Sequence, residues 1–256
     1  MAITAPLTIP TAEPFFIPGG PTGVLLVHGF TGSPFEMRNP GEYLASQGHT
    51  ILAVRLAGHA TQPEDMARVR WREWLASVED GLNLLKGSVQ RTFVMGLSLG
   101  GALALIAASY TPVAGVITMS TPYSLPDDPR LRYVRPLSRL MPRLPKGTPD
   151  WHNPEAAKDH IEYPYTPTIA IAELDDLLKV MRASLPAVKA PVLSIHSHGD
   201  HSIPSDSMAR IHAALGSHDK QTLWVENSGH NIPREPDRQL VFEAAAQFIH
   251  RLTEKV

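Results

Sequence analysis

The sequence predicts an α/β fold, with a mostly parallel central sheet flanked by helices and an inserted lid between about residues 123 and 189. Three observations carry this prediction. Short apolar, β-branched runs alternate with helix-length segments, as right-handed crossovers between parallel strands require. One of these runs turns at a serine into a helix of small residues. Ten of the 24 prolines then fall within residues 122–167 and interrupt the alternation.

Composition is that of a globular protein. With 256 residues, 43% of them hydrophobic and 19% charged, the chain can bury a substantial core. A formal net charge of −2 gives no reason to expect a nucleic acid partner. The absence of cysteine excludes disulfides, thiolate zinc sites and a cysteine nucleophile, and it fits a cytoplasmic location.

Membrane insertion and secretion are not expected. Residues 1–7 contain neither a basic segment nor a continuous apolar run of the kind that secretory signals need. No apolar stretch approaches the length of a membrane span. Oligomeric state stays open, because no sequence feature addresses it.

The first half of the chain alternates between predicted strands and helices. Residues 24–27 form a continuous apolar run, which suits a strand covered on both faces. Residues 15–17 precede a Pro/Gly turn cluster and are expected to pair as an edge strand with the segment that follows. The expected strands are 15–17, 24–27, 50–54, 92–95 and 113–119, and the expected helices are 35–47, 71–86 and 101–110.

The regular pattern resumes after the proline-rich segment. Strands are expected at 190–196 and 221–225, and helices at 207–215 and 239–252. We therefore divide the chain into one discontinuous core domain, residues 1–122 and 190–256, and a Pro-rich lid or cap, residues 123–189. The sequence contains no internal repeat and no low-complexity tract.

The segment Gly96-Leu97-Ser98-Leu99-Gly100 lies between a predicted strand and a predicted helix. A strand that turns sharply into a helix at a serine holds that serine in a strained conformation and lifts its hydroxyl clear of the sheet. Side chains at positions 96 and 100 would collide with neighbouring backbone, so glycine is required there. We interpret Ser98 as an activated nucleophile, with a glycine-rich structural turn as the alternative.

A serine hydroxyl needs a base that accepts its proton, and the base needs a carboxylate that orients it. His230 is the candidate base, because it lies in a small-residue loop after the predicted strand 221–225 and follows the serine in the chain order of such triads. Asp200, directly after strand 190–196, is the candidate carboxylate. Asp206 and Glu226 are the reserves.

A metal site is a competing interpretation of the segment around Asp200. His196, His198, Asp200 and His201 are close in sequence, and alternate strand residues can share one face. We favour the catalytic role for Asp200 and expect no metal. No cofactor is expected either, since the glycines flank a serine and do not form a phosphate-binding turn.

If Ser98 attacks an acyl carbonyl group, the negatively charged oxygen of the tetrahedral intermediate needs hydrogen-bond donors. The backbone N–H groups of Leu99, after the nucleophile, and of Phe30, in the loop after the early strand, are the candidates. Gly29 and Gly32 would let that loop fold back toward the serine. His28 is expected to brace the loop, and Phe30 to add an aromatic wall to the acyl pocket.

These motifs resemble the α/β-hydrolase superfamily, and more closely its small bacterial carboxylesterases and monoacylglycerol lipases. The resemblance runs from residue 14 to the last helix and weakens across residues 124–165. It implies a triad of Ser98, Asp200 and His230, an oxyanion hole from Phe30 and Leu99, and a lid over the acyl channel. It implies hydrolysis of small-molecule esters with short to medium acyl chains, monoacylglycerols among them. The residues that carry it are His28-Gly29-Phe30-Thr31-Gly32, Gly96-Leu97-Ser98-Leu99-Gly100-Gly101, the turn at Asp200, and Ser228-Gly229-His230.

Two other functions stay open at this point. An acyltransferase or perhydrolase would use the same triad with another acceptor. A non-catalytic protein could instead bind an apolar ligand beneath the lid. The lid also carries a basic run, which is either a solvated face or an attractor for an anionic substrate or a weakly contacted lipid surface. Its members are Arg130, Arg132, Arg135, Arg139, Arg143 and Lys146.

Overall fold

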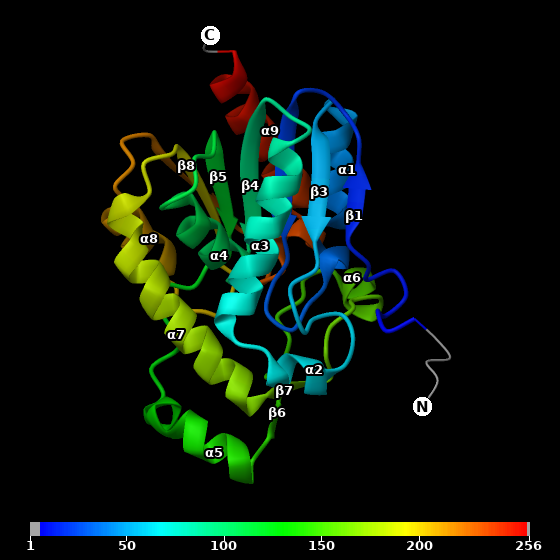
Figure 1. Cartoon of the computed structure of the whole chain (residues 1–256). Helices are drawn as coiled ribbons and strands as arrows, with labels where there is room; N and C mark the ends of the chain where they lie inside the picture. Colours follow the sequence, from blue (N-terminus) through cyan, green and yellow to red (C-terminus); the bar gives the residue numbers. More distant parts are fainter. Residues whose placement is uncertain (1–5, 255–256) are drawn as a thin grey trace.

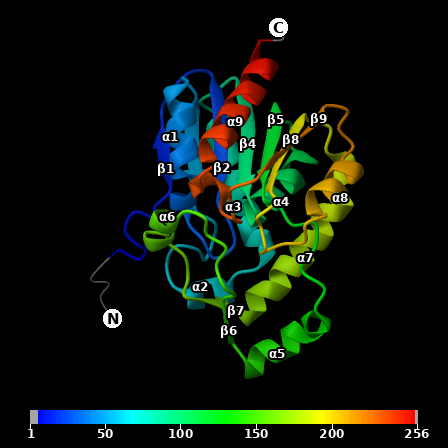
Figure 2. The ribbon, with the colours of Figure 1, turned by 180° about the vertical axis from the view of Figure 1, so that it is seen from behind.

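A seven-stranded sheet forms the centre of the computed structural model, which describes residues 6–254 apart from the side chain of Arg130. The strand order is β1-β3-β2-β4-β5-β8-β9, and every neighbouring pair is parallel except β1 with β3 (Figures 1 and 2). This confirms the predicted α/β class with a mostly parallel sheet. The strands are β1 (Phe15–Ile17), β2 (Thr22–Val27), β3 (Thr50–Val54), β4 (Arg91–Leu97), β5 (Gly115–Met119), β8 (Val192–Ser197) and β9 (Lys220–Val225).

Helices cover both faces of the sheet. On one face lie α3 (Trp71–Lys86), α4 (Leu99–Ala108), α7 (Thr168–Ser184) and α8 (Ser207–Ala214), and on the other lie α1 (Arg38–Ser46) and α9 (Arg238–Thr253) (Figures 1 and 2). The shorter elements are α2 (Pro63–Arg68), α5 (Val134–Leu140), α6 (Pro154–Lys158), a hairpin of β6 (Arg143–Pro145) and β7 (Tyr165–Pro167), and 3₁₀ turns at Pro34–Met37, Pro129–Tyr133, Leu185–Ala187 and Ile232–Arg234.

The core consists of two apolar layers, one on each face of the sheet. The strands β2, β4 and β5 are continuously apolar because both of their faces are covered. Helix α4 is buried on all sides, since it packs against β4 and β5 below it and against α3 and α7 around it. Its run of Gly and Ala residues fits that crowding, because larger side chains would not find space there.

Three local features differ from the sequence-based expectation. Strand β1 pairs with β3 and not with the segment that directly follows it, because β2 has β3 and β4 as its two neighbours. The helix expected at 35–47 begins as a 3₁₀ turn before α1 continues it. Helix α2 lies between the expected strand 50–54 and the expected helix 71–86, where no helix was expected. Within residues 6–254, no helix combines the length and apolar character that crossing a bilayer demands.

The predicted cap, residues 123–189, contains two different kinds of structure. As the prolines indicated, its first part is cut into short pieces, and these lie beyond the carboxyl ends of the strands (Figure 1). Its second part is the 17-residue helix α7, which belongs to the layer that covers the sheet. Leu177, Leu178 and Met181 of α7 are fully buried in that layer. That residues 123–189 act as a lid stays a prediction, as does the exact division from the core.

The burial of α7 leads to a stability prediction. Leu178→Ala should lower the free energy of unfolding by about 2–5 kcal/mol, because it leaves a cavity in the layer between α7 and α4. Urea unfolding followed by circular dichroism measures this difference. Lys179→Ala, at the neighbouring exposed position, is the matched control and should change stability by less than about 1 kcal/mol. Equal, small effects of both substitutions would contradict the packing described here.

Candidate active site

The turn between β4 and α4 holds Ser98 in a strained conformation. Its φ of +52° and ψ of −114° lie outside the regions that side-chain-bearing residues usually adopt. A Cβ atom at position 96 would lie 2.2 Å from the carbonyl oxygen of Gly100, and one at position 100 would lie 2.2 Å from that of Val27. Both distances are too short for non-bonded atoms, so the predicted steric need for glycine is confirmed.

Asp200 and His230 meet at the carboxyl ends of β8 and β9, two adjacent parallel strands. The Nδ1–H group of His230 donates to Oδ2 of Asp200 over 2.8 Å. The backbone N–H of Ser202 donates to the other oxygen, Oδ1, over 2.9 Å. With Nδ1 carrying the proton, Nε2 of the neutral imidazole keeps a lone pair that can accept a proton. His230 and Ser98 line the same cavity.

The Asp200 carboxylate is held in its ionised form. Its side chain is fully buried, and Nε2 of a second histidine, His196, lies 3.5 Å from Oδ2. Burial by itself would raise the pKa of Asp200, but the contacts with His196, His230 and Ser202 outweigh it and lower that pKa. The negative charge is therefore present throughout the neutral pH range.

His230 has the opposite shift. Burial would lower the pKa of its imidazole, but the hydrogen bond and charge of Asp200, with smaller contributions from Asp150 and Glu36, raise it above the usual value. The side chain keeps 23% of its surface exposed. A histidine of raised pKa is a stronger base, which suits the removal of a proton from a hydroxyl group.

The loop after β2 lies next to the turn at Ser98, because β2 and β4 are neighbouring parallel strands. Within residues 6–254, the backbone N–H groups of Phe30 and Leu99 donate to no acceptor of the protein. His28 is fully buried, donates from Nδ1 to the Gly29 carbonyl over 2.9 Å and accepts at Nε2 from the Leu56 N–H over 3.1 Å. Through these two hydrogen bonds His28 braces the loop as predicted. Burial, followed by the charge of His59, holds the pKa of His28 well below the usual value.

Glu36 is a buried residue of the site that the sequence analysis missed. Its carboxylate accepts hydrogen bonds from the Gly29 N–H over 2.8 Å and from Nδ2 of Asn231, the residue after His230, over 3.2 Å. Burial raises its pKa. The signal in the sequence is a lone acid between Phe35 and Met37 at a helix start, where burial is visible only after the loop has folded back.

The insertion supplies a polar side to the site. Nζ of Lys146 donates to Oγ1 of Thr31 over 2.8 Å and forms an ion pair with Glu162. Nε2 of His160 lies 3.6 Å from Glu36. The backbone N–H of Tyr163 donates to the Thr31 carbonyl over 3.1 Å. These contacts join the loop after β2 to two separate segments of the insertion.

Part of the basic run is engaged within the chain. Arg135 pairs with Glu173 at 2.9 Å and also with Asp176, whereas Arg143 lies 3.3 Å from Glu64. Together with Lys146, these residues are held by carboxylates of the same molecule. The side chain of Arg130 lies outside the described part of the structure. Weak contact of the lid with a lipid surface stays a prediction.

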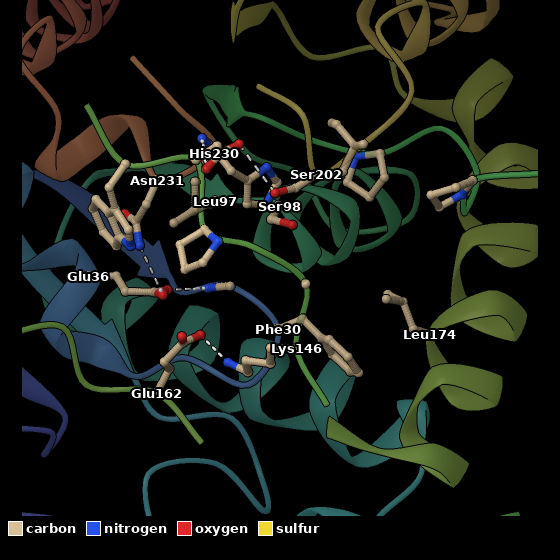
Figure 3. A pocket seen from close by; sticks show the side chains of 18 of the residues that line it. Phe30, Glu36, Leu97, Ser98, Lys146, Glu162, Leu174, Ser202, His230 and Asn231 are labelled. Atoms are coloured by element: carbon tan, nitrogen blue, oxygen red, sulfur yellow. Dashed lines mark hydrogen bonds and ion pairs between the residues drawn. The ribbon is translucent and has the colours of Figure 1, made fainter. Parts of the chain in front are cut away.

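A cavity of about 310 Å³ lies over Ser98 and His230. In the view of Figure 3, Leu174 stands on one side of Ser98, and Glu36 and Glu162 stand on the other. Apolar Leu174 and the two carboxylates therefore flank Ser98 from different sides. The apolar lining of the cavity includes Phe30, Leu97, Leu125, Pro126, Leu174 and Ile203, and its polar lining includes Glu36, Lys146, Asp150, His160, Glu162 and Asn231.

The two reserve candidates for the carboxylate, Asp206 and Glu226, have partners other than His230. Asp206 precedes α8 and lies 3.6 Å from Arg210, and Glu226 lies 3.6 Å from the exposed His198. His196 and His198 both pack against the Trp224 ring. The described residues include no group of three His, Asp or Glu side chains that could hold a metal ion.

The fold and this arrangement at the carboxyl ends of the strands define a class of protein. The chain belongs to the alpha/beta hydrolase family, whose model matches residues 24–244. This confirms the family resemblance and the α/β-hydrolase fold that the motifs implied.

Two known proteins and one solved structure are similar to this chain over nearly its whole length. The chain is 35% identical over 239 residues to the thermostable monoacylglycerol lipase of Bacillus sp. (strain H-257), covering 93% of this chain and 94% of that one. It is 29% identical over 252 residues to a carboxylesterase of Bacillus subtilis (strain 168), covering 96% and 99%. It is also similar to a solved structure described as one of two metagenome-derived lipolytic enzymes, LipS and LipT, with a TM-score of 0.90, 34% identity, and coverage of 95% and 99%.

The packing of the turn predicts that Gly100 cannot carry a side chain. Gly100→Ala should reduce the yield of folded protein or lower the melting temperature, because its Cβ would overlap the Val27 carbonyl. Gly87→Ala is the matched control, since Gly87 has ordinary helical angles and its nearest neighbouring atom would be 3.5 Å from a Cβ. Differential scanning calorimetry compares the two. A Gly100→Ala protein as stable and as well folded as the Gly87→Ala protein would show that the turn is looser than described.

Proposed function

We propose that this α/β hydrolase is a carboxylic ester hydrolase that works through an acyl-enzyme on Ser98. The observation that carries the proposal is the 2.8 Å bond between His230 and Asp200 beside a serine held at φ +52°, all at the carboxyl edge of one sheet. Serine nucleophiles of hydrolases are presented by such strained strand-to-helix turns. The names of the relatives, a monoacylglycerol lipase and a carboxylesterase, support the same reaction class.

The chemistry follows from the roles that these groups can take. As Oγ of Ser98 attacks the ester carbonyl, its proton moves to Nε2 of His230, and Asp200 stabilises the imidazolium. The oxyanion accepts hydrogen bonds from the backbone N–H groups of Phe30 and Leu99. His230 then protonates the leaving alcohol, and the acyl group stays on Ser98. Water, deprotonated by His230, attacks the acyl-enzyme and releases the carboxylic acid.

The positions of Leu174 on one side of Ser98 and of Glu36 and Glu162 on the other support a division of the substrate into two parts. The acyl chain lies along the apolar side, between Phe30 and Leu174, where burial of methylene groups is favourable. The alcohol lies toward Lys146 and Glu162, whose charges can bind hydroxyl groups. This favours esters of short to medium acyl chains with a polar alcohol, which is the chemistry of a monoacylglycerol.

Replacement of the nucleophile tests the reaction class. Ser98→Ala should lower kcat on p-nitrophenyl esters by at least about 10³-fold, because only binding and oxyanion contacts remain. Ser109→Ala, a serine at the other end of α4, is the matched control and should keep its activity. A series of p-nitrophenyl esters of increasing acyl length, with monoacylglycerol alongside, defines the substrate range. Folded wild-type protein that is inactive on every ester and unlabelled at Ser98 by an organophosphonate would favour a non-catalytic ligand-binding protein.

The raised pKa of His230 predicts the pH dependence of the reaction. Protonated His230 cannot accept the serine proton, so activity is present above its pKa and lost as the pH falls through it. For a neutral ester, kcat/KM should decline about tenfold per pH unit on the acid side, with an apparent pKa above the ordinary histidine value of about 6.5. His198→Gln, at an exposed histidine outside the site, should leave this profile unchanged. An acid limb well below pH 6 would be inconsistent with the electrostatics of His230.

A further inference from the structure

Asp150, in the Pro-rich insertion, contacts the loops that carry Asp200 and His230. Its Oδ1 atom accepts a hydrogen bond from the backbone N–H of His230 over 3.1 Å. Its Oδ2 atom accepts one from the backbone N–H of His201 over 3.0 Å and a longer one from Oγ of Ser202, at 3.4 Å. The Asp150 carboxylate therefore accepts hydrogen bonds from His230, the candidate base, and from His201, the residue that follows Asp200.

These bonds close a ring. His230 donates through its ring to Asp200 and through its backbone to Asp150. Asp150 in turn holds His201 and Ser202, and the backbone N–H of Ser202 bonds Asp200. Rotation or displacement of either loop would break at least one of these bonds. Hydrogen bonds to an ionised acceptor are stronger than those between neutral groups, so the ring resists such movement.

The segment that carries Asp150 is itself fixed in place. The backbone N–H groups of His152 and Asn153 donate to the carboxylate of Glu235, which is fully buried. Nδ2 of Asn153 donates to the Arg234 carbonyl over 2.9 Å. A Cβ atom at position 229 would lie 2.1 Å from the Asp150 carbonyl oxygen, so the two backbones are in direct contact next to His230. The Asp150 carboxylate is thus presented from a preorganised position.

We propose that Asp150 is a positioning residue for catalysis, which holds the loops of Asp200 and His230 in register through their backbone N–H groups. This inference rests on the proposed function. It assigns to the insertion a part in the reaction beyond covering the substrate, since Asp150 lies far from the triad in sequence and contacts it only in the folded chain. Asp150 acts through His230 and Asp200, so its role is in their alignment.

The charge of Asp150 gives this role a distinctive signature. The negative charges that act on the His230 imidazole are those of Asp200, Asp150 and Glu36, and Nε2 of His196 lies 3.5 Å from Oδ2 of Asp200. Burial lowers the pKa of His230, and these three carboxylates raise it. Removal of the Asp150 charge therefore lowers that pKa, and the acid limb of kcat/KM moves to lower pH. A side chain that served only the stability of the fold would not move this limb.

The test compares neutral and charged replacements on p-nitrophenyl acetate. Asp150→Asn should lower kcat about 10- to 100-fold with KM changed less than about threefold, because misalignment affects the transition state more than substrate binding. Its acid limb should move to lower pH than that of the wild type, because one of the negative charges that raise the pKa of His230 is gone. Asp150→Glu keeps the charge, so its acid limb should stay near that of the wild type while kcat recovers in part. Glu155→Gln removes an exposed carboxylate from the same insertion and is the matched control.

The possible outcomes separate this proposal from the proposed function. If the wild type hydrolyses the ester and is labelled at Ser98, the function stands. An Asp150→Asn protein with the kcat and acid limb of Glu155→Gln then overturns the positioning role alone. Asp150→Ser is the second neutral variant. If both neutral variants fail to fold, as judged by circular dichroism at 25 °C, Asp150 serves stability and the positioning role is likewise rejected.

Discussion

The close approach of α4 to the backbones of β2 and β4 is the constraint on which the site depends. Only a hydrogen atom fits at positions 96 and 100, because carbonyl oxygens lie where a Cβ would be. This contact lets the chain reverse from strand to helix within one residue, and that residue is Ser98. It also brings the start of α4 next to the loop after β2, so that the amides of Leu99 and Phe30 follow the ends of two adjacent strands, β4 and β2. The buried, small-residue character of α4 is part of the same requirement.

The carboxylates of the site are buried together with the hydrogen-bonding groups that shift their pKa values. Asp200 is fully buried yet keeps its charge, because two histidines and a backbone N–H surround it. Its charge then favours a proton on His230. Glu36 differs from Asp200, because burial raises the pKa of its carboxyl group. Its hydrogen-bond donors are the Gly29 backbone N–H and the Asn231 side-chain amide. Preorganised charges of this kind need no rearrangement during a reaction.

The insertion takes part in the site more closely than a simple cover would. Lys146 and Tyr163 bond Thr31 in the loop after β2, while Asp150 bonds the backbone of His230. Its last helix, α7, packs into the core and presents Leu174 to the cavity. The proline-rich part and the parallel sheet are thus joined around one cavity, which both apolar and charged side chains line.

The sequence by itself determined the elements whose signals are local. Continuous apolar runs specify the parallel strands, helical spacing specifies α3 residue for residue, and the Gly-x-Ser-x-Gly segment specifies the turn at Ser98. Chain order and loop context selected Asp200 and His230, which the structure brings within hydrogen-bonding distance. The prolines led us to treat residues 123–189 as one insertion, so the helix α7 within it was not predicted. The burial of α7 depends on its partner helix α4. Only the tertiary structure decided the roles of Glu36 and Asp150. A lone carboxylate has no periodicity that sequence can reveal, and its partners are backbone N–H groups that come together only when distant loops pack.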